Sequence, residues 1–150
     1  MRSRLLTDHH GTRTFAVALA TGEPLMESIT RFAAEHGLAA SEFTAIGAFA
    51  SAKLACFDPE TRGYADIPVE EQVELASLNG RITRPEGGEG DPHLHVHCVL
   101  SRRDGSAVAG HLIEAEVRPT AEIFIIDSPT ELHRRTDPES GLPALEPEIE

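Results

Sequence analysis

The segment HLHVHCVLSRRDGSAVAGHLIEAEV, residues 93–117, predicts two antiparallel strands joined by a short turn, and it carries four of the chain's eight histidines. Successive side chains of a strand point to opposite faces, so the apolar residues of the first strand separate completely from His93, His95 and His97. Imidazoles two residues apart on a strand start about 6.6 Å apart at Cα, and both can reach one ion at about 2.0–2.1 Å. The pattern therefore predicts a metal-binding face.

The length of the turn decides whether His111 joins this face. A two-residue loop would place His111 opposite Cys98, on the apolar side of the pair. A three-residue loop over residues 103–105, with a left-handed glycine at its end, would place His111 opposite His97. We favour the longer loop because the shorter one would bury an imidazole among aliphatic side chains. Three imidazoles from adjacent strands would then leave a fourth metal position open.

Zinc is the first expectation for a set of ligands made of imidazoles, although nickel, copper and cobalt suit the same donors. His95, His97 and His111 are the predicted ligands, and His93 is a fourth candidate. Glu122, then Glu114, are candidates for a base that activates metal-bound water or for a group that orients an imidazole. The alternative for the histidines and the glutamates alike is an ordinary solvent-facing place on a strand.

The first third of the chain predicts a strand, a helix and a broken strand. Residues 14–20 form a short apolar run typical of a buried strand. Residues 25–36 place apolar side chains on one helical stripe between Pro24 and Gly37, which are suited to the helix start and stop. Residues 42–58 predict two strands separated at Gly47, where another backbone comes close, with a helix as the alternative.

The remainder of the chain predicts strands in succession. The turn residues at 58–63 predict a hairpin, and the alternating segment that follows predicts a half-buried strand that ends near Asn79-Gly80. Three strand-like segments follow between residues 93 and 127. We assign residues 1–136 to one domain and residues 137–150 to an acidic, proline-containing tail, partly disordered or packed on the domain.

Composition limits the partners. Thirteen basic residues against 25 acidic ones give a net charge of −12, which disfavours nucleic-acid binding by charge attraction. The chain has no apolar run of the roughly 20 residues that a membrane helix needs, and its first residues lack the apolar core of an export signal. We therefore expect a cytoplasmic protein without a membrane partner.

Five segments carry a resemblance to a known family: AIGAFASAKLACFDP, VELASLNGRI, HVHCVLSRRDG, AGHLIEAEVRPTAEI and DPESGL. Together they resemble the plants and prokaryotes conserved domain, abbreviated PPC, in its prokaryotic stand-alone form, over most of residues 13–142. The most specific match is His95 and His97, then Asp104-Gly105, then Gly110-His111. The usual Gly-Gly-His of the family is Ala109-Gly110-His111 in this chain.

The resemblance implies an α+β fold with a largely antiparallel sheet flanked by helices, assembled as a homotrimer. It also implies a zinc-type histidine site near the subunit boundary. Family descriptions often include DNA binding, but plant relatives owe that activity to a separate Arg-Gly-Arg-Pro element, which is absent from this sequence.

Three functions are compatible with these features. The first is a trimeric metal-binding protein with a regulatory DNA-binding role that the resemblance alone implies. The second is a zinc-dependent hydrolase that acts on a small molecule with metal-bound water as nucleophile. The third is an assembly module in which the ion ties subunits together and has four protein ligands.

Overall fold

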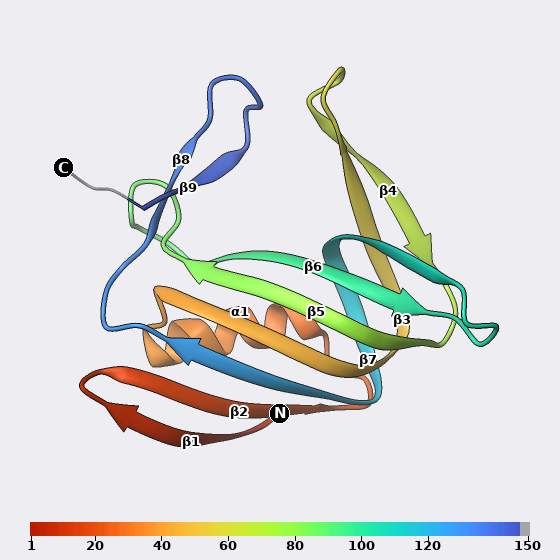
Figure 1. The fold of residues 1–150 in the computed structure, drawn as a ribbon, viewed down its shortest axis with the longest axis horizontal. Coiled ribbons are helices and arrows are strands. Elements are labelled where there is room, and N and C mark those ends of the chain that lie inside the picture. Colours follow the sequence, from red (N-terminus) through yellow and green to blue (C-terminus); the bar gives the residue numbers. More distant parts are fainter. Residues whose placement is uncertain (148–150) are drawn as a thin grey trace.

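The computed structural model describes residues 1–147, and in them strands form nearly all of the regular structure (Figure 1). The elements follow one another in this order: β1 (Arg2–His9), β2 (Thr12–Ala20), α1 (Leu25–His36), β3 (Ala40–Asp58), β4 (Gly63–Val69), β5 (Val73–Thr83), β6 (His93–Ser101), β7 (Ala107–Asp127), β8 (His133–Thr136) and β9 (Pro143–Glu146). The first seven strands form an antiparallel sheet in the order β1-β2-β7-β6-β5-β3-β4, and β8 and β9 form a separate pair.

The long strands β3 and β7 bend the sheet until it closes on itself. β5 pairs with β3 and β6, β6 pairs with β7, and β7 pairs with β3, so these four strands complete a ring. The apolar core lies between the inner face of the bent sheet and α1, and it includes Phe15 of β2, Phe32 of α1 and Phe43 of β3, each at most 4% exposed.

The expected α+β class, with helices flanking the sheet, is wrong. Strands make up 63% of the residues that the structure describes and helix 8%, and α1 is the one helix among residues 1–147. Residues 25–36 combine an apolar stripe of helical period with a suitable start and stop, whereas the segments near both ends of the chain form the strand pairs β1–β2 and β8–β9. The protein is therefore a mostly β domain.

The helix begins and ends where the sequence predicts. Leu25, Ile29 and Phe32 are fully buried on one side, and Gly37 adopts a left-handed conformation with φ of 62°. Pro24 precedes the first turn in an extended conformation. At 12 residues, this helix is too short and too polar to cross a membrane, and residues 1–147 contain no other helix.

Gly47 marks a bulge inside β3 and not a gap between two strands. The pairing of β3 with β5 shifts between Ala45 and Gly47, and β3 continues without interruption to the hairpin with β4. The predicted close approach is confirmed, since a Cβ on Gly47 would lie 2.3 Å from the carbonyl oxygen of Thr120 on β7, and its φ is 148°. Glycine is therefore required at the point where β3 crosses β7.

Gly80 lies inside β5 and not at the predicted strand end. We expected a strand end near Asn79-Gly80, but β5 continues to Thr83 and pairs with strands on both sides. A Cβ on Gly80 would lie 2.2 Å from the ring of Phe43 across the pair. The glycine makes room for a buried aromatic ring, and this packing replaces the turn that Asn-Gly usually favours.

An ion pair with a buried carboxylate joins the paired strands β2 and β7. Asp127, 3% exposed at the end of β7, accepts hydrogen bonds from Arg13 Nη2 at 2.6 Å and from Ser41 Oγ at 2.6 Å. Arg13 Nη1 also donates to the carbonyl oxygen of His36, the last residue of α1. Strands β2, β3 and β7 are thus fixed to the carboxyl end of the helix.

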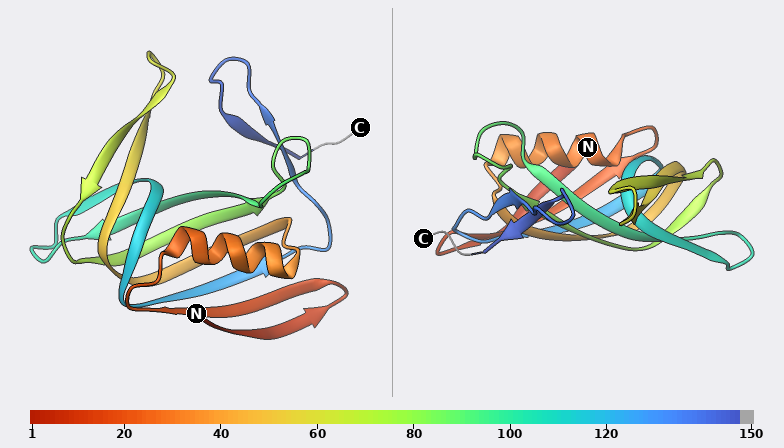
Figure 2. Two further views of the ribbon diagram at one scale, coloured as in Figure 1. Left: turned by 180° about the vertical axis from the view of Figure 1, so that it is seen from behind. Right: turned by 90° about the horizontal axis from the view of Figure 1, so that it is seen from above.

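Two hairpins, β3–β4 and β8–β9, project from the same side of the sheet (Figures 1 and 2). Residues 137–147 of the predicted tail lie in and around the β8–β9 hairpin, and residues 148–150 lie outside the described residues. The division of the chain at residue 136 stays a prediction.

Candidate metal centre

The β6–β7 hairpin sets the register of the histidines. The turn is closed by the N–H of Arg102, which donates to the carbonyl oxygen of Ser106 at 2.8 Å, and by the N–H of Gly105, which donates to that of Arg102 at 2.9 Å. Gly105 has a φ of 84°, as the three-residue loop requires. His97 pairs directly with His111, so the predicted register is confirmed.

The structure brings His95, His97 and His111 together at one point. One nitrogen from each lies within 4.8 Å of the others, and the Nε2 atoms of His95 and His97 are 3.2 Å apart. The three ring centroids are separated by 5.1 to 5.4 Å. Nitrogens placed this closely on two paired strands can all bind a single ion.

The donors themselves fit a metal. His111 Nδ1 is buried, and it is the buried side-chain nitrogen or oxygen that has no hydrogen-bond partner among residues 1–147. An unsatisfied buried polar atom costs about 1–3 kcal/mol, so such atoms are rare unless a ligand or water completes them. The arrangement is therefore chemically incomplete in the protein alone and suited to a divalent transition metal.

Burial prepares these imidazoles to bind a cation. The pKa of His95 is lowered to about 4. Burial is the largest cause, and the charges of Arg134 and of the neighbouring imidazoles contribute the rest. Burial also lowers the pKa of His111 below its usual range, with His97 next in effect. Both rings are consequently neutral at pH 7, and a neutral ring has the free lone pair that a metal requires.

His93 lies on the same face of β6 but outside this group of nitrogens. It is half-buried and pairs across the sheet with Thr83 of β5. Burial lowers its pKa as well, and Arg134 is the next cause. The group within mutual reach therefore has three members, and it contains no carboxylate.

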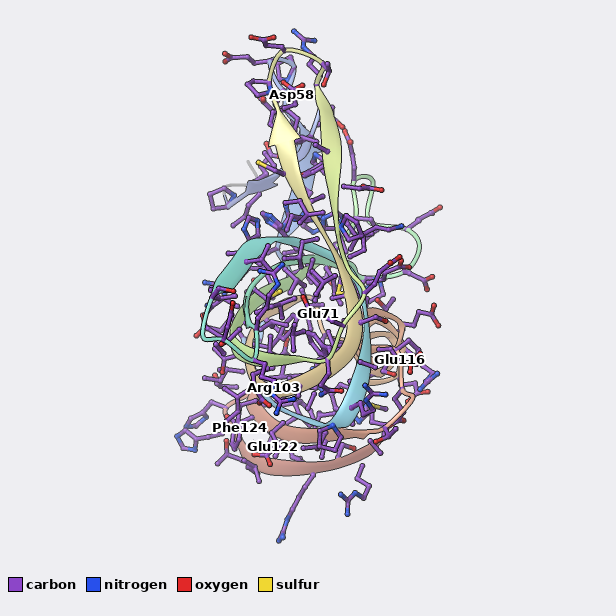
Figure 3. The ribbon with its side chains drawn as sticks, turned by 90° about the vertical axis from the view of Figure 1, so that its right-hand side faces the viewer. Asp58, Glu71, Arg103, Glu116, Glu122 and Phe124 are labelled. Atoms are coloured by element: carbon purple, nitrogen blue, oxygen red, sulfur yellow. The ribbon has the colours of Figure 1, made fainter. Side chains whose placement is uncertain are left out.

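The structure places Glu122 far along β7 from the turn. It pairs with Ala18 on one side and Ile46 on the other, beside the exposed Phe124. Figure 3 shows Glu122 and Phe124 at the end of the molecule opposite Asp58, the residue at the tip of the β3–β4 hairpin. Glu122 does not belong to the histidine group within one chain.

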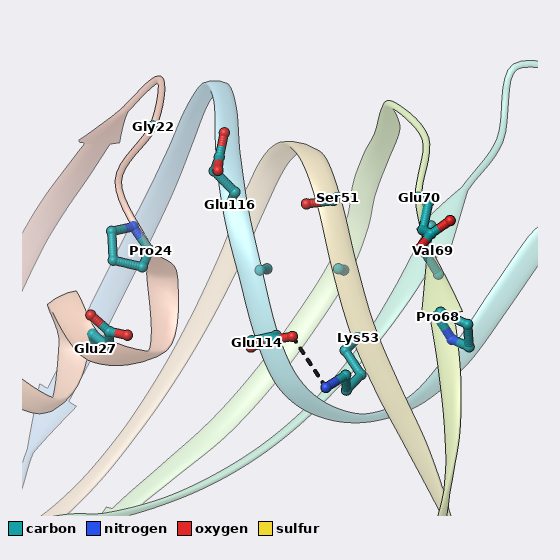
Figure 4. Close-up of a pocket in the computed structure, with 12 residues that line it drawn as sticks. Gly22, Pro24, Glu27, Ser51, Lys53, Pro68, Val69, Glu70, Glu114 and Glu116 are labelled. Atoms are coloured by element: carbon teal, nitrogen blue, oxygen red, sulfur yellow. Dashed lines mark ion pairs between the residues drawn. The ribbon is translucent and has the colours of Figure 1, made fainter.

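Glu114 lies in a separate pocket. Its Oε1 is 3.3 Å from Nζ of Lys53, and the pocket of about 500 Å³ is also lined by Glu27, Glu70 and Glu116 (Figure 4). The register of β7 against β3 shifts between Leu112 and Glu114, and Glu114 pairs across the sheet with Lys53. Glu114 likewise does not belong to the histidine group.

Two neighbours of the site were not predicted. The ring of Tyr64 on β4 lies 5.2 Å from that of His111, tilted by 34°. Arg134 on β8 is 6% exposed, and its charge acts on three of the histidines. The sequence indicates a special place for Tyr64 only weakly, in that it is the chain's single tyrosine. No sequence pattern indicates the place of Arg134, because it lies in a hairpin that is distant in sequence from the histidines.

These features define a class: a mostly β domain with three converging imidazoles on one hairpin. The sequence matches the family described as the Plants and Prokaryotes Conserved (PCC) domain, called PPC above, over residues 7–129. The match spans most of the chain, and the protein therefore belongs to this family, as the resemblance indicated. No curated protein sequence matches the chain.

Solved structures share the whole fold. The metal-containing protein AF0104 from Archaeoglobus fulgidus is 32% identical with a TM-score of 0.81, over 88% of this chain and 91% of its own. A plant- and prokaryote-conserved protein from Pyrococcus horikoshii is 28% identical with a TM-score of 0.81, over 99% and 96%. A protein from Bacteroides thetaiotaomicron, named as a proposed DNA-binding protein, is 26% identical with a TM-score of 0.85, over 96% of both chains.

Proposed function

We propose that the protein binds one divalent transition metal ion per chain, with zinc as the first expectation, through His95, His97 and His111. The observation that carries this proposal is the convergence of three nitrogens within 4.8 Å, one of them from the other strand of the hairpin. The similarity to a protein described as metal-containing supports it. When bound, the ion would supply a positive charge and an open ligand position.

Elemental analysis of protein purified without an affinity tag tests this function. After incubation with equimolar zinc and desalting, the protein should retain about one ion per chain, and His97→Ala should retain less than about a tenth. His9→Ala, an exposed histidine of β1, is the matched control and should retain the full amount. Retention of no metal by the unaltered protein would refute the proposal.

The assembly we propose is a homotrimer, as the family resemblance implies. The outer face of the sheet supports self-association, because Ile46, Phe124 and Ile126 are 59%, 53% and 44% exposed there on paired strands. Light scattering should give three times the mass of one chain, and Phe124→Glu should lower it. Loss of the trimer on chelation would favour an ion that ties subunits together, whereas an intact trimer would favour an ion with an open position.

A hydrolase acting on a small molecule is the second candidate, favoured by a group of three protein nitrogens where a purely structural zinc site has four ligands. A general base must come within hydrogen-bond reach of the reacting group, and Glu122 and Glu114 lie outside the group in one chain. A panel of small esters and amides tests this function. Metal-dependent turnover that disappears in His97→Ala would support it, and inactivity across the panel would leave a binding role.

A DNA-binding role is the less favoured alternative. The net charge of −12 repels a polyanion, and Lys53 is the chain's one lysine, held in an ion pair with Glu114. We therefore expect no retardation of duplex DNA at micromolar protein near physiological salt. Retardation that weakens steeply with added salt would overturn this expectation.

A further inference from the structure

Arg134 is a buried cation without a carboxylate partner in the part of the chain that the structure describes. It is 6% exposed, and its Nε donates to Thr83 Oγ1 at 3.0 Å while its Nη1 donates to the carbonyl oxygen of Pro143 at 2.7 Å. Both acceptors are neutral. No carboxylate of residues 1–147 lies within ion-pair distance of it, and its Nη2 has no hydrogen bond in that range.

A buried guanidinium with only neutral acceptors lowers the stability of the fold unless an anion or water binds its remaining N–H groups. A buried guanidinium stays charged at neutral pH, and a neutral acceptor offsets only part of the free energy lost when the guanidinium leaves water. The other arginines of the β8 region have carboxylate partners: Arg84 pairs with Glu131 at 2.7 Å, and Arg135 pairs with Glu146 at 2.7 Å. The buried arginine is therefore the exception, and its free N–H groups are available to a ligand.

Arg134 lies on the histidine side of the sheet. Its partner Thr83 pairs directly with His93, and Arg81, two residues earlier on β5, pairs with His95. Its charge is felt by His93, His95 and His111, after the larger effect of burial on each. The β8–β9 hairpin that carries it stands next to the end of β5 and the start of β6 (Figure 1). The site thus has a locally positive potential in a chain whose net charge is −12.

We propose that Arg134 makes the histidine site selective for an anionic ligand, a small molecule that bears one carboxylate. A guanidinium offers paired N–H donors that match the two oxygens of a carboxylate, and a single guanidinium balances a single negative charge. The cation is fixed in advance by Thr83 and Pro143, so the ligand does not have to order it. The inference rests on the proposed metal site and names the class of ligand that this site takes.

The test uses the 150-residue chain loaded with Co²⁺, whose visible absorption reports changes at the ion. The probe is acetate, and acetamide is the neutral control of the same shape. We expect acetate to change the spectrum with saturation and acetamide to change it little. Arg134→Met should weaken acetate binding at least tenfold, while Arg135→Met, at the exposed neighbouring arginine that pairs with Glu146, should stay within about twofold. Unchanged acetate binding in Arg134→Met would overturn the proposal.

Further arms separate the other outcomes. Arg134→Lys keeps the charge but loses the paired donors, so it should bind acetate more weakly than the unaltered protein and more tightly than Arg134→Met. If Arg134→Met does not fold, Arg134→Lys replaces it in the comparison with the unaltered protein, and equal acetate binding by the two would overturn the proposal. A chain that ends at Pro147 lacks Glu148 and Glu150 and should bind acetate as the full chain does. A tenfold gain in that shorter chain would mean that the protein's own carboxylates occupy Arg134, which would overturn the small-molecule proposal.

Metal content, measured on every sample, keeps this inference distinct from the proposed function. If the unaltered protein binds no metal, the proposed function fails, and thermal unfolding of the metal-free protein then tests whether Arg134 binds a carboxylate. Acetate should then raise the melting temperature relative to the same concentration of chloride, and Arg134→Met should remove the difference. Equal melting temperatures in acetate and chloride would overturn the inference.

Discussion

Lowering the pH should destabilise the metal-free protein through His95. Burial holds the pKa of this imidazole at about 4, against an ordinary value of 6.5, so the unfolded chain binds more protons below pH 6.5 than the folded chain does. The contribution of His95 is therefore fully present above pH 6.5 and is lost as the pH falls towards 4. Linkage puts the loss between pH 7 and pH 5 at about 1.8 kcal/mol, which we reduce to about 1 kcal/mol because the ring is partly exposed.

Urea unfolding in EDTA at pH 7, 6 and 5, at one subunit concentration, measures this loss. His95→Gln has no titratable group, so its free energy of unfolding should fall by about 1 kcal/mol less than that of the unaltered protein over the same range. His9→Gln, on the exposed strand β1, should follow the unaltered protein. Equal losses in the His95 variant and the unaltered protein would show that burial does not shift this imidazole as we describe.

Three further substitutions test the packing that positions the site. Gly47→Ala should cost at least about 3 kcal/mol in urea unfolding, because its Cβ would lie 2.3 Å from the Thr120 carbonyl oxygen; a cost below about 1 kcal/mol would contradict this close approach. Gly80→Ala should cost about 3 kcal/mol, and adding Phe43→Leu should make the double variant less unstable than the sum of its parts, whereas simple additivity would disprove the ring contact. Asp127→Asn should lower the free energy of unfolding by about 2 kcal/mol at pH 7, because Arg13 would lose its charged partner; a loss below about 0.5 kcal/mol would argue against the ion pair.

The histidine register could be predicted because the sequence offers two choices with different costs. A shift of one residue in the loop would exchange His111 between the polar and apolar faces, and only one choice leaves an imidazole out of the core. The helix over residues 25–36 was predictable for a similar reason, since a complete apolar stripe lies between Pro24 and Gly37. Local periodicity and turn chemistry are enough where one face of a short element is buried.

Other features depend on contacts between distant segments. Asn79-Gly80 has the composition of a turn, but the ring of Phe43 from another strand decides its structure. Tyr64 and Arg134 reach the site through the β3–β4 and β8–β9 hairpins, whose direction no local pattern fixes. The flanking helices were expected from the resemblance and not from periodicity, and this part of the prediction was wrong.

The three imidazoles belong to a stretch of chain that runs from residue 95 to residue 111, within one hairpin. The relative positions of the three rings follow from one turn and one register, so we expect a β-hairpin with the same loop to carry them already aligned into an unrelated scaffold. Tyr64 and Arg134 would stay behind, because other hairpins supply them. Mutations in those hairpins can therefore change which molecules reach the three imidazoles while the alignment of the imidazoles stays the same.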